Sequence, residues 1–273
     1  MNIYKLIALD MDGTLLRSDK TVHPNTIRDI AAASSRGCVV VYCTGRGVVE
    51  LGDYFENLPM MRYAICNSGA VIYDCQEDKC IYHKEISRED VLEIVRVSLN
   101  SHAMVHFLTD RESIVCSADV THMQDFHMEV YAPMYFQIAK QVESMEKEAE
   151  KHVSIAKVNI YFRSEEDRLK GYEALKHLPL SFAFAEKTSL EMTACGVSKG
   201  TGIEKLAEYL KIPMEQTVGI GDSDNDKEML SQVAFPIAMG NARACIQKQC
   251  NYITADNDHN GVGEALQYLG LCN

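Results

Sequence analysis

The 273-residue sequence lacks the features of exported, membrane-spanning and nucleic-acid-binding proteins. No apolar run approaches the ~20 residues that a membrane-spanning helix needs. The N-terminus has no basic stretch followed by a long apolar segment, which argues against a secretory signal. The formal net charge is −12, so there is no basic excess to meet a nucleic-acid backbone. We therefore expect a soluble, cytoplasmic protein with neither a membrane nor a nucleic-acid partner.

Cysteines at metal-ligand spacing are also missing. None of the ten cysteines forms a CxxC pair, so the sequence offers no zinc site of that kind. Several lie inside apolar, strand-like runs, and without an export signal we expect them to be buried free thiols. These are Cys38, Cys43, Cys66 and Cys116. The acidic balance does not exclude small phosphorylated ligands, because a metal ion and one or two local cations can dominate the field at a site.

The feature around which the chain is organised is an apolar run that ends in acids. Leu6 to Leu9 is followed by Asp10, Asp12 and Gly13. Two carboxylates this close raise each other's proton affinity unless a cation or hydrogen bonds hold them, and a divalent metal ion is the usual solution. The pair Asp12-Gly13 is also typical of an ordinary turn after a strand, and the motif alone does not decide between these interpretations.

Later segments repeat the pattern of a strand followed by a helix. The apolar runs 38–43 and 63–66 end in small or polar residues, and residues 51–58 have apolar side chains at helical spacing. Such alternation is typical of a parallel sheet with crossover helices. Open sheets of this kind bind ligands at the carboxyl ends of their strands. The sequence therefore predicts an α/β fold with a ligand site at the strand ends.

The middle of the chain has a different character. Two helices with N-terminal capping residues are predicted, one from Ser87 with Asp90 and one from Ser164 with Asp167. Short strand-like segments surround them, while residues 119–137 are rich in Met, His and Tyr and give no clear pattern. We interpret residues 83–189 as an α+β module inserted into a larger domain that comprises residues 1–82 and 190–273.

The last third returns to acids at a strand end. Ser198-Lys199-Gly200 opens a predicted helix, and the strand 217–220 runs into a segment with four acidic or amide side chains. These are Asp222, Asp224, Asn225 and Asp226. An alternative is a calcium-binding turn, but the bidentate Glu that an EF-hand loop needs at its twelfth position is missing.

Together these groups suit phosphoryl transfer from a phosphomonoester. A carboxylate can attack phosphorus, which divides a difficult hydrolysis into two easier steps. Mg²⁺ held by Asp10, Asp222 and the backbone carbonyl of Asp12 would screen the repulsion between the attacking group and the phosphate. The Asp12 side chain would protonate the leaving group and later activate water. Lys199 and Thr44, each beside a predicted helix start, would bind phosphate oxygens.

Each of these residues also has an ordinary structural interpretation. Lys199 alone could be a solvated lysine at a helix start, and Thr44-Gly45 alone a turn between a strand and a helix. Four histidines, His102, His106, His122 and His127, suggest a second metal site, but their spacings fit no single helix face. We favour solvated or partly buried histidines. The joint presence of the acids, the lysine and the threonine favours the catalytic interpretation.

The same segments resemble the haloacid dehalogenase superfamily of phosphohydrolases, and within it the Cof-type branch. The four motifs occur in the family's order along the whole chain. They are DMDGTL (Asp10 to Leu15), CTGR (Cys43 to Arg46), VSKG (Val197 to Gly200) and GDSDND (Gly221 to Asp226). The resemblance implies a Rossmann-like parallel sheet with helices on both faces, and a type IIB cap inserted between the second and third motifs.

The resemblance also implies a role for each motif residue. Asp10 would be the nucleophile and Asp12 the general acid and base. The implied catalytic residues are Asp10, Asp12 and Lys199, the phosphate-binding residues Thr44, Gly45, Lys199 and Asn225, and the metal-site residues Asp10, Asp12, Asp222 and Asp226. One departure is Ser68, which separates Asn67 from Gly69 where Cof-type chains usually have Asn-Gly, so the resemblance assigns no role to Asn67.

We therefore expect a Mg²⁺-dependent phosphatase that hydrolyses small phosphorylated metabolites, such as sugar phosphates or phosphorylated cofactors, through an aspartyl-phosphate intermediate. The protein would be a monomer or a homodimer, and its partner a small phosphorylated metabolite. Two alternatives stay open, a phosphomutase on the same core and a phosphate-responsive binding protein without turnover. Substrate choice should reside in the inserted module, because a cap closes the site from water and contacts the leaving group.

Overall fold

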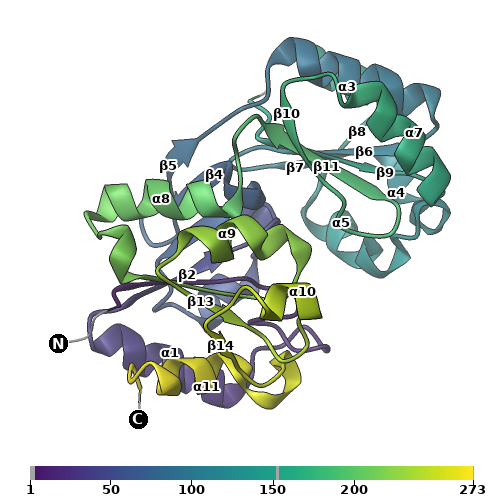
Figure 1. Ribbon diagram of the computed structural model, residues 1–273. Helices are drawn as coiled ribbons and strands as arrows, with labels where there is room; N and C mark the ends of the chain where they lie inside the picture. The colour runs from purple at the N-terminus through teal and green to yellow at the C-terminus, as the bar shows by residue number, and fades with distance from the viewer. Residues whose placement is uncertain (1–3, 152–153, 273) are drawn as a thin grey trace. The chain divides into compact units, whose positions relative to one another are not determined.

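The computed structural model describes residues 4–151 and 154–272 and divides the chain into two compact units (Figure 1). The first unit contains the chain up to Gly45, Asp53–Tyr82 and the chain from Ser198 onward. The second contains Arg46–Gly52 and His83–Val197. The units divide after residues 82 and 197. The domain bounds expected from the sequence are 82/83 and 189/190, and position 189/190 lies inside a strand of the second unit.

A mostly parallel sheet forms the centre of the first unit. Its strands are arranged in the order β14-β13-β12-β1-β2-β3-β4-β5, and the pairs from β14 to β3 are parallel. The strands are β1 (Leu6–Leu9), β2 (Val39–Cys43), β3 (Tyr63–Cys66), β4 (Val71–Asp74), β5 (Lys79–His83), β12 (Thr217–Gly221), β13 (Phe235–Ala238) and β14 (Tyr252–Ile253). The central strand β1 is fully buried, as expected for a strand covered on both faces.

Helices cover both faces of this sheet. Figure 1 shows α8 (Lys199–Leu210) and α9 (Lys227–Gln232) on one side, and α1 (Pro24–Ser35) and α11 (Gly261–Tyr268) on the other. A further short helix is α10 (Ala244–Gln247). The predicted α/β core with a parallel sheet and helices on both faces is confirmed.

The helix predicted from the apolar spacing of residues 51–58 is shorter than expected. The structure has a 3₁₀ turn, η1 (Val48–Glu50), and then a separate five-residue helix, α2 (Asp53–Asn57). Gly52 lies between them with a φ of +37°, outside the right-handed helical region. Pro59 follows shortly after α2 and cannot continue a helix. Residues 48–50 thus become part of the second unit, whereas α2 stays with the first.

The second unit is an α+β module around a six-stranded sheet, in agreement with the predicted insertion of an α+β region. The strand order is β10-β11-β9-β6-β7-β8, and all pairs except the parallel pair β7–β8 are antiparallel. The strands are β6 (Met104–Leu108), β7 (Ser113–Cys116), β8 (Lys140–Val142), β9 (Lys157–Tyr161), β10 (Leu180–Ala183) and β11 (Ser189–Ala194).

The helices of the second unit begin as their capping residues predict. The side chain of Ser87 accepts a hydrogen bond from the backbone of Asp90 at the start of α3 (Arg88–Asn100), and Ser164 does the same for Asp167 at α7 (Glu165–Leu175). Residues 119–137, which the sequence left without a pattern, contain only short helical pieces. The shorter helices are α4 (Ser117–Val120), α5 (Ala132–Ile138) and α6 (Met145–Glu150).

Both faces of the second sheet are covered by buried apolar side chains, and one of them also carries polar residues. One face carries apolar side chains, among them Phe107, Val158 and Leu190, which pack into a core with buried residues of α3 such as Ile94. Successive residues of a strand point to opposite faces. Because His106, Asn159 and Glu191 pair in register across β6, β9 and β11, their side chains share the other face.

Candidate active site

The site of the first unit lies at the carboxyl ends of neighbouring parallel strands. Asp10 directly follows β1, Thr44 follows β2 and Asp222 follows β12, and the register pairs these three strands side by side. This edge is where open α/β sheets bind their ligands. Residues more than 170 positions apart in the sequence therefore meet at one edge of the sheet. The polar residues that follow each apolar run in the sequence predict this arrangement.

Lys199 connects the acids of two strand ends. Its Nζ lies 2.5 Å from Asp10 Oδ1 and 2.6 Å from Asp226 Oδ1. The lysine is at the first position of α8, where Ser198 caps the helix by accepting a hydrogen bond from the backbone of Thr201. It is only 1% exposed, so the interpretation of Lys199 as a solvated lysine does not hold.

The burial of this cluster changes the proton affinities of its members. Burial and then the charge of Asp226 raise the pKa of Asp10 well above its ordinary value, although Lys199 opposes the effect. The pKa of Asp222 is raised by burial and by Asp226 as well. Burial alone would lower the pKa of Lys199, but Asp10 and Asp226 together raise it. The ammonium group is thus firmly charged, while burial and Asp226 favour the protonated forms of Asp10 and Asp222, which added positive charge would oppose.

The loop after β12 is built around the side chain of Asp226. Asp226 is fully buried, and its Oδ2 accepts hydrogen bonds from the backbone N–H groups of Asp222 and Ser223, both at 3.0 Å. Its other oxygen contacts Lys199. A side chain at position 221 would meet the Asp226 carboxylate, since a Cβ there would lie 2.6 Å from Oδ2. Asp226 therefore fixes the loop that presents Asp222.

Thr14 and Gly13 both lie against the carboxylate of Asp222. The Thr14 hydroxyl donates a hydrogen bond of 2.9 Å to Asp222 Oδ1. A Cβ at Gly13, whose φ is +84°, would lie 2.6 Å from Asp222 Oδ2, so only glycine allows this approach. Sequence reasoning missed the role of Thr14, although the residue belongs to the DMDGTL motif. In the sequence, Thr14 is marked only by its position four residues after Asp10. That position indicates a role only once the structure places Asp222 beside it.

Three carboxylates of this site can hold a metal ion. One oxygen each from Asp10, Asp222 and Asp226 can be chosen so that all lie within 4.8 Å of one another. Opposite oxygens in a Mg²⁺ shell are about 4.2 Å apart, so the group has comparable dimensions. Three carboxylates against one ammonium leave two formal negative charges, which suits a hard divalent cation. Both oxygens of Asp226 accept hydrogen bonds within the loop and from Lys199, so Asp10 and Asp222 are the stronger candidates for direct metal ligands.

The remaining candidates occupy different surroundings. The Asp12 side chain is 42% exposed and accepts a 2.8 Å hydrogen bond from Lys20, a residue that sequence reasoning did not single out. Asn225 Oδ1 accepts a hydrogen bond from the Ser223 hydroxyl. Thr44 is buried and its backbone N–H bonds to β3. Gly45 is the last residue of its segment of the first unit.

Asn67 lies in the 3₁₀ turn η2 (Asn67–Gly69) after β3. It is fully buried, and both Asn67 and Ser68 have positive φ values, 51° and 57°. At Gly69 the backbone approaches the start of α8 so closely that a Cβ would lie 2.0 Å from the Ser198 carbonyl oxygen. This turn therefore supports the helix that carries Lys199.

The four histidines do not form a second metal site. Among residues 4–151 and 154–272, the acidic group of Asp10, Asp222 and Asp226 is the only one in which three potential ligands come close enough for a metal ion. His106 is buried and hydrogen-bonded within the second unit. In the same part of the chain, no helix is both long and apolar enough to span a bilayer.

Comparison with known proteins gives matches along nearly the whole chain. The model of the haloacid dehalogenase-like hydrolase family matches residues 7–266. Phosphatase YwpJ of Bacillus subtilis is 27% identical, with 97% of this chain and 99% of that protein covered. The 5-amino-6-(5-phospho-D-ribitylamino)uracil phosphatase YitU of the same organism is 28% identical, with coverages of 97% and 98%. A solved haloacid dehalogenase-like hydrolase from B. subtilis is 26% identical and superimposes with a TM-score of 0.86, covering 97% of this chain and 99% of that one.

Proposed function

Because the chain belongs to the haloacid dehalogenase-like hydrolases and is a phosphatase of the Cof type, we propose that it uses Asp10 as a nucleophile and Mg²⁺ as its cofactor. Its substrates are small phosphorylated metabolites, such as sugar phosphates or phosphorylated cofactors. The relative YitU, named for a phosphorylated ribitylaminouracil, supports a substrate of this size. The contact of Lys199 with both Asp10 and Asp226 is the observation on which the proposal rests.

In the first step Asp10 attacks phosphorus. A new bond forms between a carboxylate oxygen of Asp10 and phosphorus while the bond from phosphorus to the leaving oxygen breaks, which gives an aspartyl phosphate. Oδ1 accepts a hydrogen bond from Lys199, so we assign the attack to Oδ2. The charge of Lys199 lowers the pKa of the Asp10 carboxyl group and so opposes the effect of burial. The ammonium group also attracts the phosphate oxygens, and Thr44, Gly45 and Asn225 supply further donors.

Asp12 transfers the protons of both steps. It gives its proton to the leaving alkoxide in the first step, and in the second it takes a proton from the water that attacks phosphorus and releases Asp10. Its side chain is 42% exposed and can exchange protons with solvent between turnovers. Mg²⁺ held by Asp10, Asp222 and the backbone carbonyl of Asp12 would neutralise charge on the phosphate. Asp226 would keep the Asp222 loop and Lys199 in place.

Phosphate release from a panel of phosphomonoesters, with Mg²⁺ and with EDTA, tests this function. We expect Mg²⁺-dependent release of phosphate, and loss of turnover by at least about a thousandfold in Asp10→Asn, because an amide oxygen does not form the acyl phosphate. Asp19→Asn is the matched control, since Asp19 is an exposed loop residue whose side chain contacts the neighbouring Thr21 and Arg17. Its activity should equal that of the wild type.

Two results would contradict the proposal. Transfer of phosphate between hydroxyl groups without net release would indicate a mutase. Binding of phosphate esters without any turnover, in a wild-type protein that is folded by circular dichroism, would indicate a binding protein.

A further inference from the structure

A short hairpin directly after the DMDGTL motif carries a lysine to which the proposed chemistry assigns no task. Leu16 forms an antiparallel bridge with Val22 and a parallel bridge with Asp12, so residues 16–22 fold back beside the motif. Lys20 lies in the turn of this hairpin. The hairpin and Asp12 both belong to the first unit.

The ammonium group of Lys20 binds a defined oxygen of Asp12. Lys20 Nζ lies 2.8 Å from Asp12 Oδ1, and both side chains are about half exposed. An exposed ion pair contributes little to the stability of a fold, because water screens the charges and ordering two side chains costs entropy. Stability alone is therefore a weak reason for the chain to build this contact.

The backbone of Lys20 is held in a conformation that lysine rarely adopts. Its φ is +65°, in the left-handed region where a residue with a Cβ is strained. Two hydrogen bonds fix this conformation. The Lys20 N–H donates to the Arg17 carbonyl at 2.9 Å, and the Lys20 carbonyl accepts a 2.9 Å hydrogen bond from the Tyr54 hydroxyl. Strain of this kind persists where the surrounding structure imposes it, and it is concentrated at functional sites.

Tyr54 ties the turn of the hairpin to the centre of the parallel sheet. It belongs to α2, and its own carbonyl accepts a hydrogen bond of 2.9 Å from the hydroxyl of Tyr42, a fully buried residue of β2. Thr44 follows directly after this strand. The turn that presents Lys20 is thus fixed to the strand that leads to the proposed phosphate-binding threonine.

We propose that Lys20 is a positioning residue for Asp12, which holds its carboxyl group in one orientation during both proton transfers. This inference rests on the proposed phosphatase function and adds a residue to its machinery. An ammonium group only donates, so Oδ1 is the acceptor in this pair and the proton that Asp12 transfers lies on Oδ2. In the first step the Oδ2–H bond breaks and the proton joins the leaving oxygen, whose bond to phosphorus breaks. Lys20 itself neither gains nor loses a proton.

The need for this positioning depends on the leaving group. A weakly basic leaving oxygen departs without a proton, whereas a strongly basic one needs protonation as its bond to phosphorus breaks. Phenyl phosphate and p-nitrophenyl phosphate differ only in the nitro group, which makes p-nitrophenolate the weaker base. Their kcat/KM values cover the steps up to loss of the leaving group, so they isolate the first proton transfer from the later attack of water.

The variant Lys20→Met removes the ammonium group and keeps an unbranched side chain. We expect its kcat/KM for phenyl phosphate to fall about tenfold, a part of the roughly 10²–10⁴-fold that general acid catalysis contributes. For p-nitrophenyl phosphate the change should be less than about twofold, because this leaving group needs little protonation. Lys20→Arg keeps a charged donor and should recover much of the activity on phenyl phosphate.

A double-mutant cycle with Asp12→Asn tests whether Lys20 acts through Asp12. We expect Asp12→Asn to lower kcat/KM for phenyl phosphate by about a hundredfold or more. In that background Lys20→Met should add less than about twofold, because no carboxyl group is left to position. A merely structural role of the hairpin would instead give the same loss of about tenfold in both backgrounds.

Lys205→Met is the matched control. Lys205 belongs to α8 of the same unit, its side chain is about half exposed, and its Nζ forms a comparable ion pair of 3.0 Å with Glu208. This variant should hydrolyse both esters as the wild type does.

The outcomes separate the two claims. Equal losses for the two esters in Lys20→Met, unchanged activity on both, or an undiminished loss in the Asp12→Asn background would overturn the positioning role and leave the phosphatase function standing. Failure of the wild type to hydrolyse either ester with Mg²⁺ would instead overturn the proposed function, and this inference with it.

Discussion

Each unit of the protein buries one lysine among carboxylates, and the two lysines differ in what surrounds them. Lys199 and Lys157 are both 1% exposed, which is rare for lysine. Lys199 contacts Asp10 and Asp226 at 2.5 and 2.6 Å, with Asp222 close to both acids. Lys157 forms an ion pair of 2.7 Å with Glu191. The single charge of Lys199 thus stands against three carboxylates, whereas the charge of Lys157 is paired with the carboxylate of Glu191.

This difference shows that burial of a lysine does not by itself identify a catalytic site. The excess of acids around Lys199 suits a divalent cation, and burial, followed by the charge of Asp226, raises the pKa of both Asp10 and Asp222. Around Lys157 the pair with Glu191 is locally balanced, and the charges of Lys157 and Arg46 both act on the other nearby carboxylate, Glu50. The first arrangement leaves an excess of acids that suits a cation, whereas the second does not.

The largest expected effect comes from replacing each lysine in turn. Removing one partner of a buried ion pair leaves an uncompensated charge and costs about 3–5 kcal/mol. We expect Lys199→Met and Lys157→Met both to lower the free energy of unfolding in EDTA, with Lys199→Met the more affected because three carboxylates stay behind. Urea unfolding monitored by circular dichroism measures both losses.

Adding Mg²⁺ should separate the two lysine variants. The ion can compensate the acids that Lys199→Met leaves, so part of the lost stability should return, whereas Lys157→Met should gain no more than the wild type does. Equal recovery of both variants would show that the excess of acids around Lys199 is not a cation site.

The next effect concerns metal binding in the wild-type protein. A ligand at a hundred times its dissociation constant stabilises the folded state by about 2.7 kcal/mol. We expect Mg²⁺ to raise the free energy of unfolding by this order, and Asp222→Asn to remove most of the gain because it removes a ligand charge. Glu191→Gln is the matched variant in the second unit, and it should keep the full response to Mg²⁺. Isothermal titration calorimetry with Mg²⁺ gives the affinities directly.

The sequence was sufficient to predict the site of the first unit because its residues follow strands that are recognisable one by one. Asp10, Thr44 and Asp222 each come after a buried apolar run, and Lys199 begins a helix with a clear cap. The rule that parallel strands share a ligand-binding edge then brings them together. Their partners were harder to foresee, since Thr14 and Lys20 act through contacts that depend on loop conformation.

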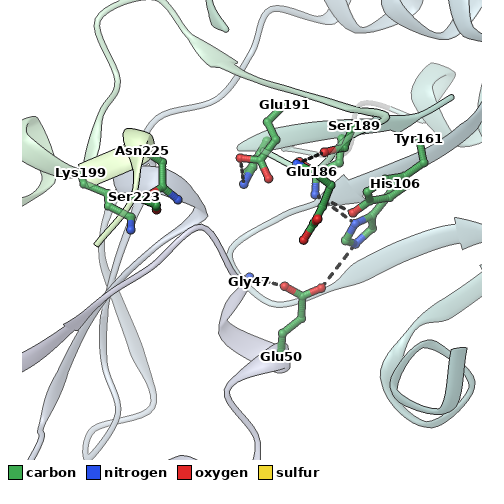
Figure 2. A network of polar contacts seen from close by, with 12 residues as sticks. Gly47, Glu50, His106, Tyr161, Glu186, Ser189, Glu191, Lys199, Ser223 and Asn225 are labelled. Atoms are coloured by element: carbon green, nitrogen blue, oxygen red, sulfur yellow. Dashed lines mark hydrogen bonds and ion pairs between the residues drawn. The ribbon is translucent and has the colours of Figure 1, made fainter. Parts of the chain in front are cut away.

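A buried polar cluster of the second unit could not be predicted in the same way; it consists of Glu50, His106, Tyr135, Asn159 and Tyr161. Figure 2 shows Glu50 directed toward the imidazole of His106, with Tyr161 beside it. Its members come from β6, β9, α5 and the segment Arg46–Gly52, and each looks like an ordinary polar residue in its own element. Antiparallel register decides that His106 and Asn159 are neighbours, and the sequence does not fix that register without the partner strands. The helix expected over residues 51–58 hid the fact that Glu50 belongs to the second unit.

The smallest effect is a pH dependence that distinguishes the polar cluster from the acids of the first unit. The pKa of His106 is about 3 in the folded protein, against an ordinary 6.5, because burial and then Lys157 disfavour its charged form. The unfolded chain therefore binds the proton more readily. Stability from this residue is complete above pH 6.5 and is lost as the pH falls toward 3, at about 1.4 kcal/mol per pH unit. At pH 5 the loss is about 2 kcal/mol.

In His106→Gln this contribution to the pH dependence should disappear, since glutamine does not titrate. The free energy of unfolding of the variant should then change less than that of the wild type between pH 7 and pH 5, and amide hydrogen exchange in β6 and β9 should report the same difference locally. The carboxyl groups near Lys199 are common to both proteins and cancel in the comparison. Parallel pH profiles for the two proteins would mean that His106 accepts a proton in the fold.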